Sequence, residues 1–198
     1  TVYADAGATG SVAAPTAGLH FTPDLLTLLV AAGVEQAQVV LHVGTGTFKP
    51  VETESLLDHP MHREWCSMDR VVAERLQAVR HSGSGRIFAV GTTSVRTLES
   101  YAARVVGVTS DPRRMSDPWP DHIDTRLLIS PGYQTQWVDG ILTNFHLPRS
   151  TLLALVAALF ERAGEPGSGI ARVKMLYAEA IRSGYRFYSY GDAMLILP

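Results

Sequence analysis

Two apolar runs in this sequence each pass through a short polar junction into a helical pattern. Residues 86–90 (RIFAV) are the first run, and the segment GTTSVRTLESYAARV that follows has the composition of a helix. Residues 138–145 (VDGILTNF) are the second run, and Pro148 and Ser150 then open another helix. Apolar side chains recur in this helix with the spacing of one buried face, at Leu152, Leu155, Val156, Leu159 and Phe160. Strands that alternate with helices in this way favour an α/β fold.

The rest of the sequence extends the same alternation. Apolar runs predict strands over 37–43, 125–130 and 192–198, and helical spacing with capping residues predicts helices over 22–33, from Asp69 to the HSGSG segment, and over 171–183. Pro131 and Gly132 mark a turn, so some antiparallel pairing is expected around them. We therefore predict one α/β domain over residues 1–198, with a mixed, largely parallel sheet or a partial barrel flanked by helices.

Composition limits the partners that can be expected. Apolar residues make up 46% of the chain, enough for a sizeable core, and the formal net charge of −2 gives no overall basic signature of a nucleic-acid-binding protein. The single cysteine, Cys66, rules out an internal disulfide and fits a reducing cytoplasm. No run of about 20 apolar residues predicts a membrane span, and the first residues lack the pattern of a signal peptide. The opening TVYADAG has no initiator methionine, so we expect a fragment without its N-terminal part.

The junction after the first apolar run has the features of an anion site. Gly91 ends the strand, and the hydroxyl residues Thr92, Thr93 and Ser94 lie where the helix begins. The unpaired N–H groups of a first helical turn and the helix dipole both favour a carboxylate or a phosphate at such a place. Arg96 is a candidate charged donor to the same anion. Ordinary capping of the helix by these hydroxyl groups is the alternative.

The second junction, TNFHLPRST, repeats this arrangement. Asn144 ends the strand and His146 follows it, at the kind of strand–helix boundary where open α/β sheets bind ligands. A lone histidine is also common as a purely structural residue. The presence of two such junctions in one domain favours a functional reading of both.

The segment HVGTGTFKPV, residues 42–51, begins like a dinucleotide-binding fingerprint but does not complete it. The full pattern needs a third glycine at the start of a helix, whereas Pro50 continues an extended chain here. Gly44 and Gly46 still allow backbone to approach a ligand closely, with His42 beside them. A tight turn at a strand end is the alternative.

Aromatic residues gather in YRFYSYGDAMLI, residues 185–196. If this segment is extended, alternation places Phe187 on one face and Tyr188 and Tyr190 on the other. Such side chains stack on nucleic-acid bases, and they serve equally well at the edge of a hydrophobic core. Asp192, which follows a glycine, is either a turn residue or a functional acid.

The histidines do not form a metal-binding motif. His20, His42, His62 and His146 show neither the i, i+4 spacing of a helical site nor a Cys-x-x-Cys partner. We therefore predict no metal.

Taken together, these motifs resemble one enzyme family. The order of seven segments is that of the S-adenosylmethionine:tRNA ribosyltransferase-isomerase family of queuosine biosynthesis: SVAAPTAGLHFT, LHVGTGTFKPV, HPMHRE, AVGTTSVRTLES, ISPGY, VDGILTNFHLPRSTLLALV and YRFYSYGDAMLI. The resemblance runs over essentially all 198 residues.

The resemblance implies an activity. Members of this family transfer the ribosyl part of S-adenosylmethionine to 7-aminomethyl-7-deazaguanine at the wobble position of tRNA and isomerise it, giving epoxyqueuosine while adenine and methionine leave. It thus implies S-adenosylmethionine as co-substrate and tRNA as partner, in the cytoplasm, with no metal and no membrane. Members of the family are longer and carry an N-terminal region with an inserted β-barrel domain, which we expect to be absent from this chain.

The implied chemistry gives the candidate residues their roles. A base must take a proton from the carbon beside the sulfonium, and the departing adenine needs a proton or a hydrogen bond. The candidates for acid–base catalysis are His20, His42, His146 and Asp192. The candidates for binding S-adenosylmethionine are Pro15, Thr16, Gly18, Gly44, Gly46, Gly91, Thr92, Thr93, Ser94, Arg96 and Asn144. The apolar segment 11–21, in which Pro15 and Gly18 interrupt both helix and strand, is then interpreted as a ligand wall, with a buried connector as the alternative.

Two other functions stay open at this point. A related transferase that acts on a free deazaguanine uses the same pocket chemistry, and a non-catalytic fragment binds S-adenosylmethionine or tRNA without turnover. Adenine release with tRNA, with the free base, or with neither separates the three.

Overall fold

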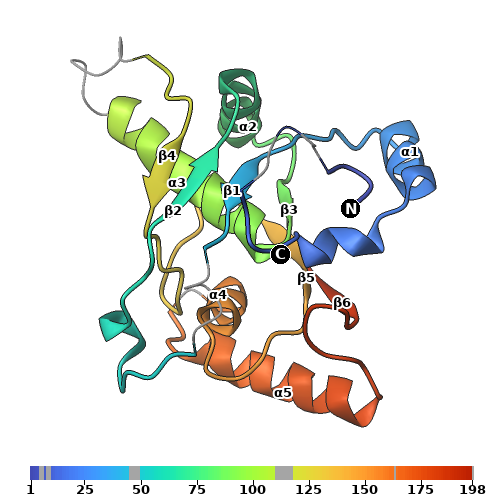
Figure 1. Ribbon diagram of the computed structural model, residues 1–198, viewed down its shortest axis with the longest axis vertical. Coiled ribbons are helices and arrows are strands. Elements are labelled where there is room, and N and C mark those ends of the chain that lie inside the picture. Colours follow the sequence, from blue (N-terminus) through green and yellow to red (C-terminus); the bar gives the residue numbers. More distant parts are fainter. Residues whose placement is uncertain (5–6, 8–9, 45–49, 110–117, 163, 198) are drawn as a thin grey trace.

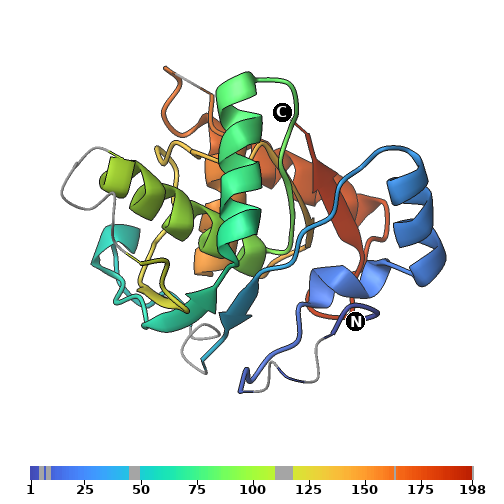
Figure 2. The same cartoon turned by 90° about the horizontal axis from the view of Figure 1, so that it is seen from above.

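Helices and strands alternate along the chain, which confirms the predicted α/β class. The computed structural model describes residues 1–4, 7, 10–44, 50–109, 118–162 and 164–197. Two three-stranded sheets form its centre, and the helix α3 (Thr92–Thr109) contacts strands of both (Figure 1). The two ends of the chain lie on opposite sides of the molecule (Figure 2).

The first sheet is antiparallel throughout. Its strand order is β1 (Val40–His42), β2 (Glu64–Ser67) and β4 (Ile123–Thr125). Cys66 is fully buried in the central strand, where its backbone faces Leu41 on one side and Ile123 on the other. Burial raises the pKa of the Cys66 thiol to about 11, so this side chain is a protonated core residue at neutral pH.

The second sheet is mixed and short. Its strand order is β3 (Phe88–Val90), β5 (Gly140–Asn144) and β6 (Ala193–Ile196); β3 runs parallel to β5, and β6 runs antiparallel to it. Gly140 is needed at the start of β5, because a Cβ there would lie 2.5 Å from the Ile196 carbonyl oxygen and 2.6 Å from the Phe88 ring.

The predicted largely parallel sheet is therefore wrong for the part of the chain that the structure describes. There β3 and β5 are the only parallel pair, and the strands do not close into a barrel. The physical reason is the connection. Helix α3 lies in the long crossover from β3 to the parallel β5, whereas two helices that pack against each other, Thr151–Leu159 and Ser168–Arg182, lie between β5 and β6 and return the chain to the end of β5, so that β6 runs back along it.

The helices agree well with the sequence predictions. The five α-helices of the described residues are α1 (Pro23–Ala31), α2 (Arg70–Ser82), α3, α4 (Thr151–Leu159) and α5 (Ser168–Arg182), with short 3₁₀ helices η1 (Thr16–His20) and η3 (Leu56–Asp58). The hydroxyl oxygens of Thr22 and Ser150 cap α1 and α4 by accepting backbone N–H groups at 3.1 and 3.2 Å. Helix α4 packs against α5 along one edge of the molecule (Figure 1).

Three local predictions differ from the structure. The predicted strand 125–130 ends at Thr125, because the Leu127 carbonyl accepts a hydrogen bond from Arg96 Nε at 3.2 Å instead of a ladder partner. Helix α3 extends to Thr109, beyond the segment GTTSVRTLESYAARV in which the sequence predicts a helix. Residues 185–191 form a turn rather than an extended segment, so the predicted alternation of their aromatic faces is wrong.

A buried carboxylate joins α3 to the segment that leads into β5. Glu99 is fully buried, and its Oε1 accepts the backbone N–H groups of Trp137 and Val138 at 3.0 and 2.9 Å. Its Oε2 accepts the N–H of Gln136 at 2.8 Å and the hydroxyl of Tyr133 at 3.2 Å. These four hydrogen bonds fix α3 relative to β5, and both elements contribute to the pocket described below.

In the described part of the chain, no helix combines the length and the apolar character that crossing a membrane requires.

Candidate functional site

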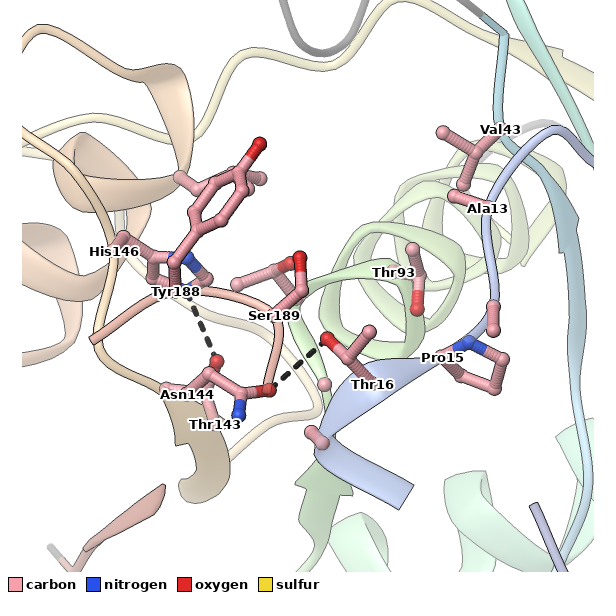
Figure 3. A pocket seen from close by; sticks show the side chains of 15 residues that line it. Ala13, Pro15, Thr16, Val43, Thr93, Thr143, Asn144, His146, Tyr188 and Ser189 are labelled. Atoms are coloured by element: carbon pink, nitrogen blue, oxygen red, sulfur yellow. Dashed lines mark hydrogen bonds between the residues drawn. The ribbon is translucent and has the colours of Figure 1, made fainter. Parts of the chain in front are cut away.

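A pocket lies where the two predicted strand–helix junctions meet the N-terminal segment. Its space, including the part open to solvent, is about 660 Å³. Figure 3 shows His146 and Tyr188 on one side of it and Ala13 and Val43 on the opposite side. It is lined by Ala13, Ala14, Pro15, Thr16, Ala17, Val43, Gly91, Thr92, Thr93, Thr143, Asn144, His146, Leu152, Tyr188 and Ser189.

The N-terminus of α3 forms one wall of the pocket. Gly91 adopts a φ of 88°, a conformation that favours glycine, and its N–H donates to the Leu142 carbonyl at 2.8 Å. The chain thereby leaves β3 and enters α3 at Thr92 and Thr93, which line the pocket. The unpaired N–H groups and partial positive charge of this helix end suit an anionic group of a ligand.

The segment that precedes α1 forms the opposite wall. Residues 13–17 line the pocket, and Ala17 and Gly18 are buried where η1 packs against the Gly91 turn. Gly18 has no room for a side chain, because a Cβ would lie 1.7 Å from the Tyr3 hydroxyl oxygen. The small residues of this segment thus let its backbone approach the other wall closely.

His146 contributes a neutral imidazole to the pocket. Its Nε2 lies 3.0 Å from the Thr143 hydroxyl oxygen, and its backbone N–H donates to the Tyr177 hydroxyl at 3.0 Å. Burial lowers the pKa of His146 to about 4, because the charged imidazolium would lose its hydration there. At neutral pH the side chain therefore carries one donor and one acceptor nitrogen.

Asn144 connects the pocket to two distant parts of the chain. Its side chain is almost fully buried at the end of β5, and its Oδ1 accepts a hydrogen bond from the Thr16 hydroxyl at 3.1 Å (Figure 3). Its Nδ2 lies 3.4 Å from His20 Nε2 and 3.5 Å from the Asp192 carbonyl oxygen.

The turn at residues 185–191 supplies the rim that carries Tyr188 and Ser189. Tyr188 adopts a φ of 75°, and its N–H donates to the Phe145 carbonyl at 2.9 Å. The Asp192 carboxylate closes the turn by accepting from the Arg186 backbone N–H at 2.7 Å and from its guanidinium at 2.8 Å. These hydrogen bonds from Arg186 lower the pKa of Asp192. Tyr190 projects from the turn and is 87% exposed.

The structure brings nearly half of the predicted site residues together. Seven of them line the pocket: Pro15, Thr16, Gly91, Thr92, Thr93, Asn144 and His146. His20 and Asp192 lie next to it, since both contact Asn144. Gly18 lies in the adjoining η1 without lining the space itself.

Other predicted residues lie elsewhere. Arg96 is buried and forms an ion pair with Glu64 of β2, so its charge is used inside the fold. The Ser94 hydroxyl donates to the Val90 carbonyl at 2.7 Å, within the helix start. The His42 ring packs edge-on against Trp65 with ring centroids 4.1 Å apart.

Neither glycine of the incomplete fingerprint, Gly44 or Gly46, is found among the described residues that line the pocket. Gly44 follows β1 and is not a pocket residue, although its neighbour Val43 is one. Gly46 lies outside the described residues. Among the residues that the structure does describe, no group of three or more His, Cys, Asp or Glu side chains is placed to hold a metal ion.

Several pocket residues were not among the predicted candidates. These are Ala13, Ala14, Ala17, Val43, Thr143, Leu152, Tyr188 and Ser189. Thr143 precedes Asn144 in the same strand-end motif, which was the available signal for it. Tyr188 and Ser189 line the pocket through the backbone turn at Tyr188, for which the sequence gives no direct sign because tyrosine rarely adopts a positive φ.

Known proteins are similar to this chain over nearly its whole length. The family described as "Queuosine biosynthesis protein" matches residues 1–196. The chain is 51% identical over 189 residues to the S-adenosylmethionine:tRNA ribosyltransferase-isomerase of Sphingopyxis alaskensis, which covers 96% of this chain and 48% of that protein. It is 48% identical over 198 residues to the enzyme of the same name from Acaryochloris marina, covering 100% of this chain and 48% of the relative.

A solved structure is similar as well. The crystal structure of S-adenosylmethionine tRNA ribosyltransferase from Thermotoga maritima matches with a TM-score of 0.64 and 40% sequence identity. The match covers 91% of this chain and 51% of that one. The chain thus spans about half the length of the relatives it matches.

Proposed function

Because the chain belongs to the family of queuosine biosynthesis proteins, we propose that it forms the S-adenosylmethionine-binding part of a tRNA ribosyltransferase-isomerase. In this proposal the ribosyl group of S-adenosylmethionine is transferred to 7-aminomethyl-7-deazaguanine at the tRNA wobble position and isomerised, in the cytoplasm and without a metal. The observation that carries the proposal is the pocket itself, in which a helix N-terminus, a neutral histidine and a wall of small residues face one space.

The N-terminus of α3 is the proposed site of the methionine carboxylate. Thr92 and Thr93 offer hydroxyl donors where the helix dipole is positive, and Thr16 faces them from η1. A carboxylate at such a helix end is stabilised by roughly 0.3–2 kcal/mol. The buried pairing of Arg96 with Glu64 leaves this anion site to the helix end rather than to that guanidinium.

His146 is the proposed base. A low pKa keeps its imidazole unprotonated at neutral pH, which is the form that can take a proton from the carbon beside the sulfonium. The imidazolium formed in this way is a strong acid in its buried surroundings. It therefore passes the proton on to the departing adenine, which needs one, and the two transfers return His146 to its neutral form.

The rim of the pocket is the proposed contact with tRNA. Tyr188 borders the pocket, and the exposed ring of Tyr190 lies two residues further on. Exposed aromatic rings of this kind stack on unpaired bases such as those of an anticodon loop. The net charge of −2 gives the chain little overall attraction for RNA, so local stacking has to contribute to binding.

Adenine release from labelled S-adenosylmethionine tests the proposal. The assay is run on the chain extended to the length of its relatives and on these 198 residues alone, with substrate tRNA and with free deazaguanine. Release that requires tRNA supports the proposal, whereas release with the free base points to a transferase for a free acceptor, and binding without release to a non-catalytic module.

A matched pair of histidine variants tests the proposed base. We expect His146→Gln to reduce adenine release by at least two orders of magnitude, in line with the loss of a general base, while the variant stays folded. His81→Gln, at an exposed position near the end of α2, is the control and should retain full release. Unchanged release by the His146 variant would contradict this assignment.

A further inference from the structure

The orientation of the Asn144 side-chain amide follows from its contact with a backbone carbonyl. The Asp192 atom that faces it is a carbonyl oxygen, which can only accept a hydrogen bond, so the amide nitrogen must point that way. The Thr16 hydroxyl donates to the amide oxygen on the other side at 3.1 Å. Asn144 is almost fully buried, so solvent does not offer it alternative partners.

The orientation of the Asn144 amide determines which ring nitrogen of His20 carries the proton. The amide nitrogen of Asn144 lies 3.4 Å from His20 Nε2 and has only hydrogen atoms to offer. A protonated Nε2 would place two donors against each other, whereas an unprotonated Nε2 accepts the amide hydrogen. The neutral imidazole of His20 therefore carries its hydrogen on Nδ1.

We propose that Asn144 is a positioning residue that holds His20 in the Nδ1–H tautomer, so that His20 acts as a hydrogen-bond donor to the substrate and not as a base. This inference rests on the proposed function, since it assigns a role to a residue that lies next to the same pocket. With Nε2 engaged by Asn144, Nδ1–H is the free polar group of the ring, and it suits an acceptor such as a carboxylate or a ring nitrogen. The base is then left to His146, which lines the same pocket.

The tautomer can be measured directly. The protein is labelled with 15N-histidine and its side-chain nitrogens are observed by NMR at about two pH units above the ordinary histidine pKa of about 6.5, where the imidazoles are neutral. A His20→Gln variant identifies the His20 signals by their loss. We expect Nε2 of His20 to show the shift of an unprotonated nitrogen and Nδ1 that of a protonated one. The reverse pattern would overturn the proposal.

An isosteric variant tests the cause. Asn144→Asp replaces the amide donor by a carboxylate oxygen that can only accept, so the His20 proton should move from Nδ1 to Nε2. The tautomer of His146, whose Nε2 contacts the Thr143 hydroxyl and not Asn144, should stay the same and serves as the internal control. A His20 proton that stays on Nδ1 in this variant would show that Asn144 does not determine it.

A second measurement does not depend on that variant folding. Asn144 is the only asparagine of the sequence, so 15N-asparagine labelling of this chain gives a single side-chain amide signal. That signal should shift in His20→Gln, and an unchanged signal would mean that the two side chains are not bonded. Neither NMR measurement requires substrate. If His20 shows the expected tautomer but no adenine is released in the assay, the result would count against the proposed function and not against the role of Asn144.

Discussion

The Glu99 carboxylate offers the sharpest test of how the pocket is held in place. Glu99→Gln keeps the size of the side chain but replaces one of its two accepting oxygens by an NH₂ group. If the NH₂ group replaces Oε2, the Tyr133 hydroxyl can turn and accept from it, but the Gln136 N–H loses its partner. If it replaces Oε1, the N–H groups of both Trp137 and Val138 lose theirs.

The structure sets the size of the effect. The better of the two arrangements leaves one buried N–H group without an acceptor, which costs about 1–3 kcal/mol. The remaining hydrogen bonds change from charge-assisted to neutral ones, which are about half as strong. The variant no longer buries a charge, and this offsets part of the loss. We therefore expect Glu99→Gln to lower the free energy of unfolding by about 3 kcal/mol. For a chain of this length that corresponds to a fall in Tm of roughly 6–12 °C.

Urea denaturation at pH 7 measures this difference, and the chain offers a matched control. Glu74 is 58% exposed and pairs with Arg70 one helical turn away, so Glu74→Gln should change the free energy of unfolding by less than about 0.5 kcal/mol. Equal stabilities of the Glu99 and Glu74 variants would refute the view that one buried carboxylate fixes α3 against the segment leading into β5.

Three further predictions concern charge and exposure. Because burial lowers the pKa of His146 to about 4, the native protein binds fewer protons than the unfolded chain below about pH 6.5. The free energy of unfolding should therefore fall by roughly 3 kcal/mol as the pH drops from about 6.5 to 4. In urea titrations at several pH values, His146→Gln should lack this fall and His81→Gln should keep it. Arg96→Met removes the guanidinium that pairs with the buried Glu64 and should cost about 3–5 kcal/mol, whereas replacing both residues by apolar ones should cost less. Strictly additive losses in denaturation would contradict this. Tyr190→Ala should weaken binding of an anticodon stem-loop RNA by about 1–3 kcal/mol, or roughly 5- to 150-fold in Kd. Tyr190→Phe should bind with unchanged affinity, because its ring still stacks. Equal affinities of the two variants would exclude stacking.

Local signals in the sequence predicted most of the helices and the two strand–helix junctions that border the pocket. The caps Thr22 and Ser150 lie where the capping pattern places them, and the junction that begins at Gly91 does form the start of α3 beside the pocket. These features depend on neighbours within one helical turn. A pattern in the sequence is therefore sufficient to find them.

Features that depend on distant partners could not be predicted in this way. The strand expected over 125–130 stops because the guanidinium of Arg96, about thirty residues earlier, binds the Leu127 carbonyl. The sequence around Arg96 suggested an anion site, but the charge is matched by Glu64 of another strand. The turn that places Tyr188 in the pocket depends on its backbone bond to Phe145 and on the pairing of Asp192 with Arg186.

The hydrogen bonds of Asn144 also have a consequence for the order in which the molecule assembles. They join residue 144 to residue 16, 128 positions earlier, and to residue 192, 48 positions later. Contacts between such distant positions carry the largest loop-closure entropy and form late in folding. The contact with residue 16 spans more of the chain than any strand pair, so the central sheets can be complete before the N-terminal segment closes the pocket. A ligand that enters the pocket should therefore slow the local opening of residues 10–20 more than that of the core, an order that hydrogen exchange resolves.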